Sequence, residues 1–391
     1  MLKKVVTIDA RSLVRDRPSG VSHYMTSLLL ALDNELSELD APKDTVYRLA
    51  VPYRHAYKLG AYGFRNFKIV KIPLPFRGIN FLIRKQLMPP IDLFLGRGMY
   101  VFPEFIRPPL LYSKSTTFIY DTVFRAMPES MDKRMLESLE KNVMKSMSKS
   151  DAIVTISNST KRELSAISPA SRNKMYVVYP SVNRAHFYPR SQQEIKKVLA
   201  KYEIFGKYIL FVGNFEPRKN LALLFEAFSL LPRGILDDYQ LLIVGASNWN
   251  SDDIYAKKEY FNQTGARIIS RLSVVSDQDL PAIYSGASLF VYPSLYEGFG
   301  MPVQEAMACG TPVICSRNSS IPEAAGDAAL YMNEKNPRDI SDKIIEALTK
   351  DSSNLIVKGF EHVDTVATWK EASRYFQKII DTAQKTSKGK K

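Results

Sequence analysis

Two glutamates, Glu297 and Glu305, stand eight positions apart in residues 294–315, SLYEGFGMPVQEAMACGTPVIC. The first precedes a Gly-Phe-Gly turn at the end of an apolar strand pattern, and the second lies in a run that predicts a helix. An ionised carboxylate only accepts hydrogen bonds, so it suits the recognition of hydroxyl groups. We interpret Glu297 as an acceptor for the hydroxyls of a sugar. Glu305, expected in the first turn of the helix, is interpreted as an acceptor for both hydroxyls of a ribose.

The turn between the two glutamates is suited to a phosphate group. Gly298 and Gly300 let the backbone approach a ligand and tolerate positive φ, and Pro302 fits the first helical position. Free backbone N–H groups of Gly300, Met301 and nearby residues would point at an anion, aided by the helix dipole. The expected binding segment therefore runs through Phe299 to Pro302. Each feature alone has an ordinary structural explanation, so the prediction of a nucleotide-sugar site depends on their combination.

Two adjacent cations, Arg218 and Lys219, follow another strand pattern in VGNFEPRKN, residues 212–220. Ligands of parallel α/β sheets bind beyond the carboxyl ends of the strands, where this segment and the Gly-Phe-Gly turn both lie. We favour a ligand-binding role over an ordinary surface pair because the segment stands between a strand and a helix.

Two runs of alternating strands and helices predict the architecture. The first opens with KKVVTIDA, a polar loop that contains Gly20, and the helical pattern VSHYMTSLLLALDNEL; the second begins with KYILFVGNF. Such alternation is typical of parallel sheets with helical crossovers. We therefore expect two Rossmann-like doubly wound domains, at residues 1–190 and 200–365, facing each other across a cleft. The pattern at 369–385 predicts a last helix that packs back on the first domain.

Composition and charge limit the class of protein. Apolar residues make up 45% of the chain and charged residues 24%, which is ordinary globular composition. The net charge is +14, and residues 1–200 carry 32 basic against 17 acidic residues, so the excess lies in the N-terminal half. The excess favours a polyanionic partner over a role in solubility alone: nucleic acid, an anionic membrane or a phosphorylated acceptor. Neither an RNP motif nor a zinc knuckle supports nucleic acid. A Rossmann dehydrogenase would need Gly-x-Gly-x-x-Gly where RPSGVSHY stands.

The N-terminus and the cysteines bear on the compartment. Cys309 and Cys315 form no disulfide framework, which favours a reducing environment. The start MLKKVVTIDA lacks the apolar region of a signal peptide, and no apolar run approaches the ~20 residues of a membrane span. We expect a cytoplasmic protein, peripheral on the inner face of the plasma membrane if residues 76–98, FRGINFLIRKQLMPPIDLFLGRG, form an amphipathic basic surface. An ordinary helix packed on the domain is the alternative.

The whole pattern resembles the retaining glycosyltransferases of family 4, which have the GT-B fold. The resemblance rests on the Glu-x7-Glu signature formed by Glu297 and Glu305, and on VGNFEPRKNL, IYDTVFRAMPE, TISNSTKREL and DARSLVRDRPSGVSHYMTSLL, in the family's order. This chain departs from many relatives in carrying Asn214 after the strand's glycine, where they have arginine. It also carries Tyr120 where the family often has histidine.

The resemblance implies roles for these residues. Arg218 and Lys219 would bind the donor diphosphate and stabilise the leaving group. Gly20 would lie near the donor phosphates and the acceptor, and Asp121 would bind a hydroxyl of the transferred sugar or, equally, cap a loop. Glu297 would position the sugar, since family members are thought to react by attack on the front face of the sugar, without a carboxylate nucleophile.

The resemblance also implies the substrates. Family 4 enzymes take a sugar from a nucleotide diphosphate, generally without a bound metal, so no metal or other cofactor is expected. Segments such as EPRKN and IYD are similar to mannosyltransferases of O-antigen and polysaccharide assembly, which favours GDP-mannose over UDP- and dTDP-sugars. The expected acceptor is a growing lipid-linked glycan or oligosaccharide. Other enzymes of the same pathway are possible partners.

Overall fold

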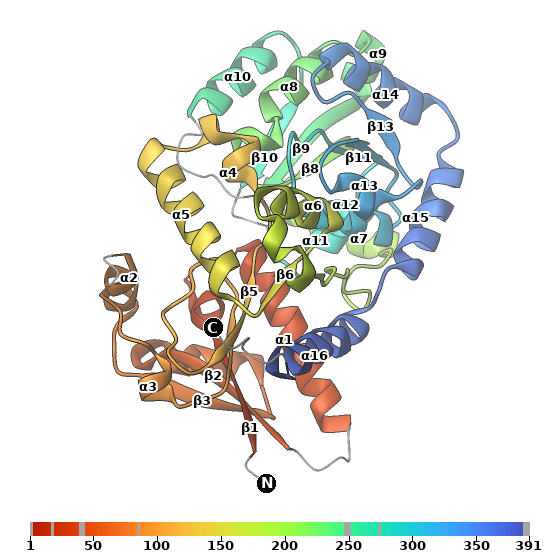
Figure 1. The fold of residues 1–391 in the computed structure, drawn as a ribbon. Coiled ribbons are helices and arrows are strands. Elements are labelled where there is room, and N and C mark those ends of the chain that lie inside the picture. Colours follow the sequence, from red (N-terminus) through yellow and green to blue (C-terminus); the bar gives the residue numbers. More distant parts are fainter. Residues whose placement is uncertain are drawn as a thin grey trace. The chain divides into compact units, whose positions relative to one another are not determined.

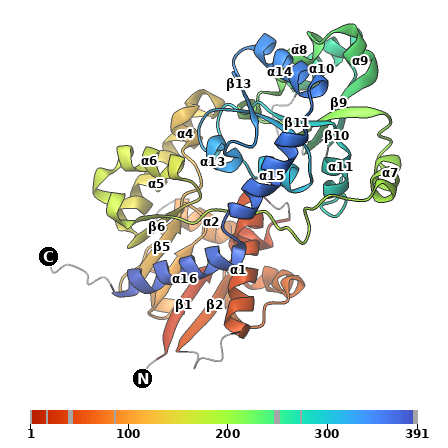
Figure 2. The same ribbon diagram turned by 90° about the vertical axis from the view of Figure 1, so that its right-hand side faces the viewer.

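The computed structural model describes residues 3–16, 19–38, 44–84, 87–245, 252–272 and 275–385. The chain divides into two compact units (Figures 1 and 2). Unit 1 comprises residues 1–124, 131–180 and 367–391, and unit 2 comprises residues 125–130 and 181–366.

Unit 1 is built on a parallel sheet, which has seven strands in the described residues, in the order β3-β2-β1-β4-β5-β6-β7. These strands are β1 (Lys4–Asp9), β2 (Thr45–Pro52), β3 (Phe67–Ile72), β4 (Met99–Phe102), β5 (Lys114–Phe118), β6 (Ala152–Thr155) and β7 (Met175–Val177). The main helices are α1 (Gly20–Glu38), α2 (Phe76–Arg84), α5 (Lys133–Lys149), α6 (Asn158–Ile167) and α16 (Trp369–Lys385). Short helices α3 (Asp92–Leu95) and α4 (Val123–Ala126) lie in the connections.

The last helix, α16, belongs to the core of unit 1. Figures 1 and 2 both show it beside α1, although most of the chain separates the two in sequence. Phe376 is fully buried, and its ring centroid lies 5.4 Å from that of Phe118 on β5. Arg374 Nε donates to the buried carboxylate of Glu35 on α1 at 2.5 Å. The apolar face therefore docks the helix, and the ion pair fixes its position along α1.

Unit 2 has a second parallel sheet, with six strands among the described residues, in the order β10-β9-β8-β11-β12-β13. Its strands are β8 (Lys207–Val212), β9 (Tyr239–Gly245), β10 (Ile268–Leu272), β11 (Leu289–Tyr292), β12 (Val313–Ser316) and β13 (Leu330–Met332). The helices are α7 (Gln192–Lys201), α8 (Leu221–Ser229), α9 (Arg233–Asp238), α10 (Asp252–Gln263), α11 (Leu280–Gly286), α12 (Met301–Ala308), α13 (Ile321–Ala325), α14 (Pro337–Thr349) and α15 (Ser353–Thr365).

The predicted class, two parallel-sheet α/β domains, is confirmed, with local corrections. Residues 192–201, which lie largely between the two predicted domains, form α7, whose start has a capping box between Ser191 and Glu194. Gly20, expected in a loop, is the first residue of α1. Helix α12 begins at Met301, and Glu305 therefore lies in its second turn and not in the first. Among the described helices, none is long and apolar enough to cross a membrane.

We predict that unit 1 needs the apolar contact of α16. Phe376→Ala should lower the free energy of unfolding by roughly 3–5 kcal/mol, because it leaves a cavity in a close-packed core. Tyr375→Ala is the matched control: this side chain is on the same helix but 44% exposed. Urea unfolding followed by circular dichroism measures both, and equal losses in the two variants would contradict the docking described for α16.

Candidate functional site

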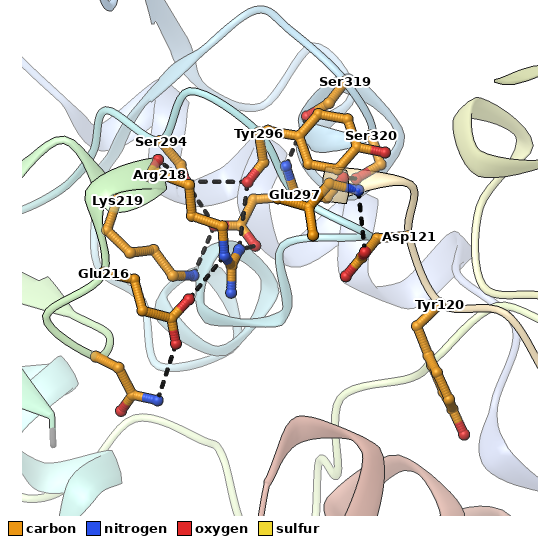
Figure 3. Close-up of polar contacts among 12 residues, drawn as sticks. Tyr120, Asp121, Glu216, Arg218, Lys219, Ser294, Tyr296, Glu297, Ser319 and Ser320 are labelled. Atoms are coloured by element: carbon orange, nitrogen blue, oxygen red, sulfur yellow. Dashed lines mark hydrogen bonds and ion pairs between the residues drawn. The ribbon is translucent and has the colours of Figure 1, made fainter. Parts of the chain in front are cut away.

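Glu297 lies at the centre of a buried cluster of polar side chains in unit 2 (Figure 3). Its Oε2 accepts from Arg218 Nη1 at 2.6 Å, and its Oε1 accepts from Lys219 Nζ at 2.6 Å. Oε1 also accepts from Ser294 Oγ at 2.6 Å and from the Tyr292 hydroxyl at 2.9 Å. The structure thus brings together Glu297, Arg218 and Lys219, three of the residues singled out in the sequence.

The sheet topology explains this meeting. Strands β8 and β11 are neighbours, with Leu289 paired to Ile209, and their carboxyl ends face the same side because they are parallel. The 3-10 turn Pro217–Lys219 follows β8, and the loop that carries Glu297 follows β11. The backbones of the two loops are joined where Leu295 N donates to Arg218 O at 2.7 Å. The two loops therefore form one rigid edge.

The two cations differ in exposure. The side chain of Lys219 is 8% exposed, whereas that of Arg218 is 24% exposed and also pairs with Glu216 Oε2 at 2.7 Å. The expectation that both cations face a ligand therefore needs correction. The Arg218 side chain is partly exposed, while Lys219 is enclosed by Glu297 and Tyr292.

Glu297 is ionised in this cluster. Burial alone would raise the pKa of its carboxyl, but the charges of Arg218 and Lys219 and the hydrogen bonds from Lys219 and Ser294 outweigh burial and lower the pKa to about 2. A carboxylate with four donors is also a poor nucleophile. Oε1 receives three of these donors and Oε2 one, so the remaining acceptor capacity lies mainly on Oε2.

The turn after Glu297 is held from the next strand. Glu297 N donates to Ser319 Oγ at 3.0 Å, and Ser320 Oγ donates to Glu297 O at 2.8 Å. These serines follow β12, which pairs with β11 in parallel. Gly300, the N-cap of α12, has φ of 106°, a conformation that glycine tolerates best. Hydrogen bonds from the loop after β12 therefore help to position the turn.

Glu305 lies apart from the Glu297 cluster in its hydrogen bonds. Its Oε2 accepts from the Tyr284 hydroxyl on α11 at 2.9 Å, and Oε1 has no partner among the described residues. Burial raises the pKa of Glu305 to about 7, with a smaller contribution from Asp277. Gly300 is the N-cap and Pro302 the second helical residue, so Glu305 lies one residue farther along the helix than expected, just beyond its first turn.

The remaining residues of the expected site lie outside the hydrogen-bonded cluster around Glu297 in the contacts described here. Phe299 is buried, and Gly298, Met301 and Pro302 are partly exposed. Gly20 and Asp121 belong to unit 1. The space for a Cβ at Gly20 is open, and Asp121 Oδ1 accepts from the backbone N–H of Val123 at 3.2 Å, a local cap at the start of α4.

Sequence reasoning missed several side chains that support the site. Ser294, Tyr292, Glu216, Ser319 and Tyr284 all bind its charged groups or its backbone. Their signal was available in part, because Ser294 and Ser319 follow buried strand patterns, where parallel sheets gather polar groups. Nothing local distinguishes Tyr284, whose role depends on the packing of α11. In the described part of the chain, no group of three or more His, Cys, Asp or Glu side chains could hold a metal ion.

We predict that Glu297 stabilises unit 2 only where its carboxylate is charged. Its folded-state pKa lies below the unfolded value, so its contribution is present above pH ~4.5 and is lost as the pH falls towards 2. At pH 7, the free energy of unfolding of the wild type should be about 3 kcal/mol larger than that of Glu297→Gln. This gap in unfolding free energy should narrow from pH 5 to pH 3.

Urea unfolding at pH 7, 5, 4 and 3 measures the gap. The matched control is Glu216→Gln, which removes the other carboxylate that pairs with Arg218 at a position 26% exposed. Solvent screens that pair, so its pH-dependent gap should be much smaller. A gap that stays constant with pH for Glu297→Gln would contradict the assignment of a charged, paired Glu297.

Comparison with known proteins finds a matching family model and related sequences. The family model described as glycosyl transferases group 1 matches residues 174–358. The O-antigen chain mannosyltransferase B of Escherichia coli is 36% identical over 257 residues, which cover 65% of this chain and 66% of that protein. The serotype-specific mannosyltransferase WbdA of Escherichia coli is 27% identical over 248 residues, covering 62% of this chain but 30% of WbdA. The chain thus spans just under two thirds of the first relative and less than a third of the second.

Solved structures agree on the fold. A glycosyltransferase from Rickettsia africae superimposes with a TM-score of 0.67 at 16% identity, over 98% of this chain and 100% of the other. The predicted GT-B class of fold is thereby confirmed. Residues 174–358 therefore match a group 1 glycosyltransferase domain, and the fold is that of a solved glycosyltransferase.

Proposed function

We propose that this chain is a retaining transferase that moves a hexose, mannose from GDP-mannose, to a hydroxyl of a growing lipid-linked glycan. The observation that carries the proposal is the Arg218–Lys219 pair, which buried Glu297 holds at the carboxyl edge of the sheet beside the Gly298–Pro302 turn. The names of the two Escherichia coli relatives support mannose and an O-antigen acceptor. The same geometry would also accept a UDP- or dTDP-sugar, which is the alternative.

The donor diphosphate would bind between Arg218 and the start of α12. The partly exposed Arg218 guanidinium would provide positive charge, and the backbone N–H groups that follow Gly300 would provide donors, aided by the helix dipole. Lys219 would add positive charge next to Arg218 without moving, because its ion pair with Glu297 already holds it there. Fixed donors of this kind stabilise a leaving phosphate as its charge develops. In this proposal, no metal ion is required for that charge.

The reaction would proceed on one face of the sugar. The bond from the anomeric carbon to the phosphate oxygen breaks, a bond to the acceptor oxygen forms on the same face, and the acceptor proton passes to the leaving phosphate oxygen. Glu297, ionised and enclosed by four donors, would not attack the sugar. It would orient Arg218 and accept one sugar hydroxyl at Oε2. Asp121 and Gly20 of unit 1 remain proposed contacts of the transferred sugar and the acceptor.

Unit 1 also offers a surface suited to an anionic membrane. Phe81 on α2 is 56% exposed, and Phe94 on α3 is 72% exposed. Basic Arg77 on α2 and Arg97 after α3 accompany them. Ile79, expected on the same apolar face, is instead buried in unit 1. The remaining exposed aromatic and basic side chains fit the interfacial region of a bilayer, where a lipid-linked acceptor would be found.

Nucleotide binding tests the proposed donor. A nucleoside diphosphate at 100 times its dissociation constant should stabilise the wild type by about 2.7 kcal/mol. We expect GDP to do so in a thermal-shift screen with GDP, UDP, ADP and dTDP, and Glu305→Ala to lose most of the shift because the ribose loses its acceptor. Failure of all four nucleotides at millimolar concentration, with folded protein, would overturn the proposed function. A response to UDP or dTDP alone would select the alternative donor.

The pH dependence of donor binding tests the role of the Glu305 carboxylate. If ribose hydroxyls donate to the Glu305 carboxylate, GDP-mannose binding requires that carboxyl to be charged. Burial raises the pKa of Glu305 to about 7, so its charge changes near neutral pH. Affinity should then rise about tenfold from pH 6 to pH 8 by linkage. Isothermal titration with GDP-mannose measures this without a titrating terminal phosphate. Glu305→Gln should bind with little pH dependence, and a wild type as flat as this variant would refute the ribose contact.

A further inference from the structure

A cavity in unit 1 has no part in the site described above. It measures about 340 Å³, and α5 forms one wall. That wall carries Arg134, Lys141 and Lys145, and half-buried Arg107 lies in the lining as a fourth basic residue. The lining includes a single acid, Glu137. The cavity is therefore strongly electropositive within a half of the chain that already holds the excess of positive charge.

The cations form an ordered row. Positions 134, 141 and 145 fall on one face of α5 because they are seven and four residues apart, close to whole turns of an α-helix. Among the residues that the structure describes, none of the three forms an ion pair with a carboxylate. Arg107 is held in place by its Nε, which donates to Ser115 Oγ at 2.9 Å. Three cations without a protein partner, beside a fixed guanidinium, fit an external polyanion.

The rest of the lining is apolar. Ile83 of α2 and Met88 face the cavity. The neighbouring Phe81 and Leu87 are exposed by 56% and 65%, so they add exposed apolar side chains close in sequence to Ile83 and Met88. A purely hydrophilic anion would contact only the basic residues of the lining. A phosphate attached to an apolar chain would contact both the basic and the apolar residues.

We propose that this cavity binds the phosphate or diphosphate of a lipid phosphate, with the chain running along α2 towards Phe81 and Leu87. The inference rests on the proposed function, because the lipid-linked acceptor would be the source of that ligand. It assigns Lys141 and Lys145 to the phosphate groups and Ile83 and Met88 to the first part of the chain. The acceptor would thus be recognised through its carrier as well as through its glycan.

The test is isothermal titration of the full chain with farnesyl diphosphate, inorganic pyrophosphate and farnesol, each with saturating GDP present so that the Arg218 region is occupied. Lys141→Ala/Lys145→Ala removes two cations from the cavity. Lys133→Ala/Lys149→Ala removes two exposed cations from the same helix outside the cavity and is the matched control. Farnesyl diphosphate should bind wild type and control alike, and the cavity variant about tenfold or more weakly, a loss of about 1.4 kcal/mol per tenfold.

Equal weakening in both double variants would overturn the proposal, because only overall charge would then matter. Pyrophosphate that binds as tightly as farnesyl diphosphate would overturn the lipid assignment in favour of a free phosphate ligand. If GDP does not bind but farnesyl diphosphate binding still depends on Lys141 and Lys145, the cavity assignment stands and the donor proposal fails. The opposite result, GDP binding without an effect of the cavity variant, leaves the proposed function intact and refutes the cavity.

Discussion

The candidate site depends on one arrangement, the burial of an ionised carboxylate between two cations. Glu297 is enclosed with Arg218 and Lys219, and a buried charge is tolerated only when it is paired and hydrogen-bonded. The pairing keeps Glu297 charged, and it also keeps two cations at a sheet edge where they would otherwise repel each other. A diphosphate that enters would therefore meet donors already in position, at little cost in rearrangement.

The fold supplies this arrangement through neighbouring parallel strands. Because β8, β11 and β12 run in the same direction, the loops that carry Arg218, Glu297 and Ser319 all leave from one edge. Hydrogen bonds between these loops, including Leu295 N to Arg218 O at 2.7 Å, make them one body. In such a fold, the loops after the strands carry the residues of the site. The strands beneath them are almost wholly buried and align the loops.

The sequence allowed the class of fold and the central residues of the site to be predicted, because both follow from local patterns. Apolar strands such as KYILFVGNF are unmistakable, and Glu297, Gly300 and Glu305 stand in one short motif. The burial of individual side chains and their hydrogen-bond partners could not be predicted from the sequence. That Lys219 is enclosed while Arg218 is partly exposed depends on the rotamers of two neighbouring loops, and that Glu305 meets Tyr284 depends on how α11 packs. The capping box at Ser191 was legible but overlooked.

The most direct test of the account is a crystal structure of the protein with GDP bound. We expect an Arg218 nitrogen about 3 Å from an oxygen of the β-phosphate, while Glu297 keeps its ion pairs with Arg218 and Lys219. We also expect both ribose hydroxyls to donate to Glu305. A nucleotide bound without contact to Arg218, or bound only after the Glu297–Arg218 pair has broken, would contradict the claim that this buried carboxylate prepares the diphosphate site.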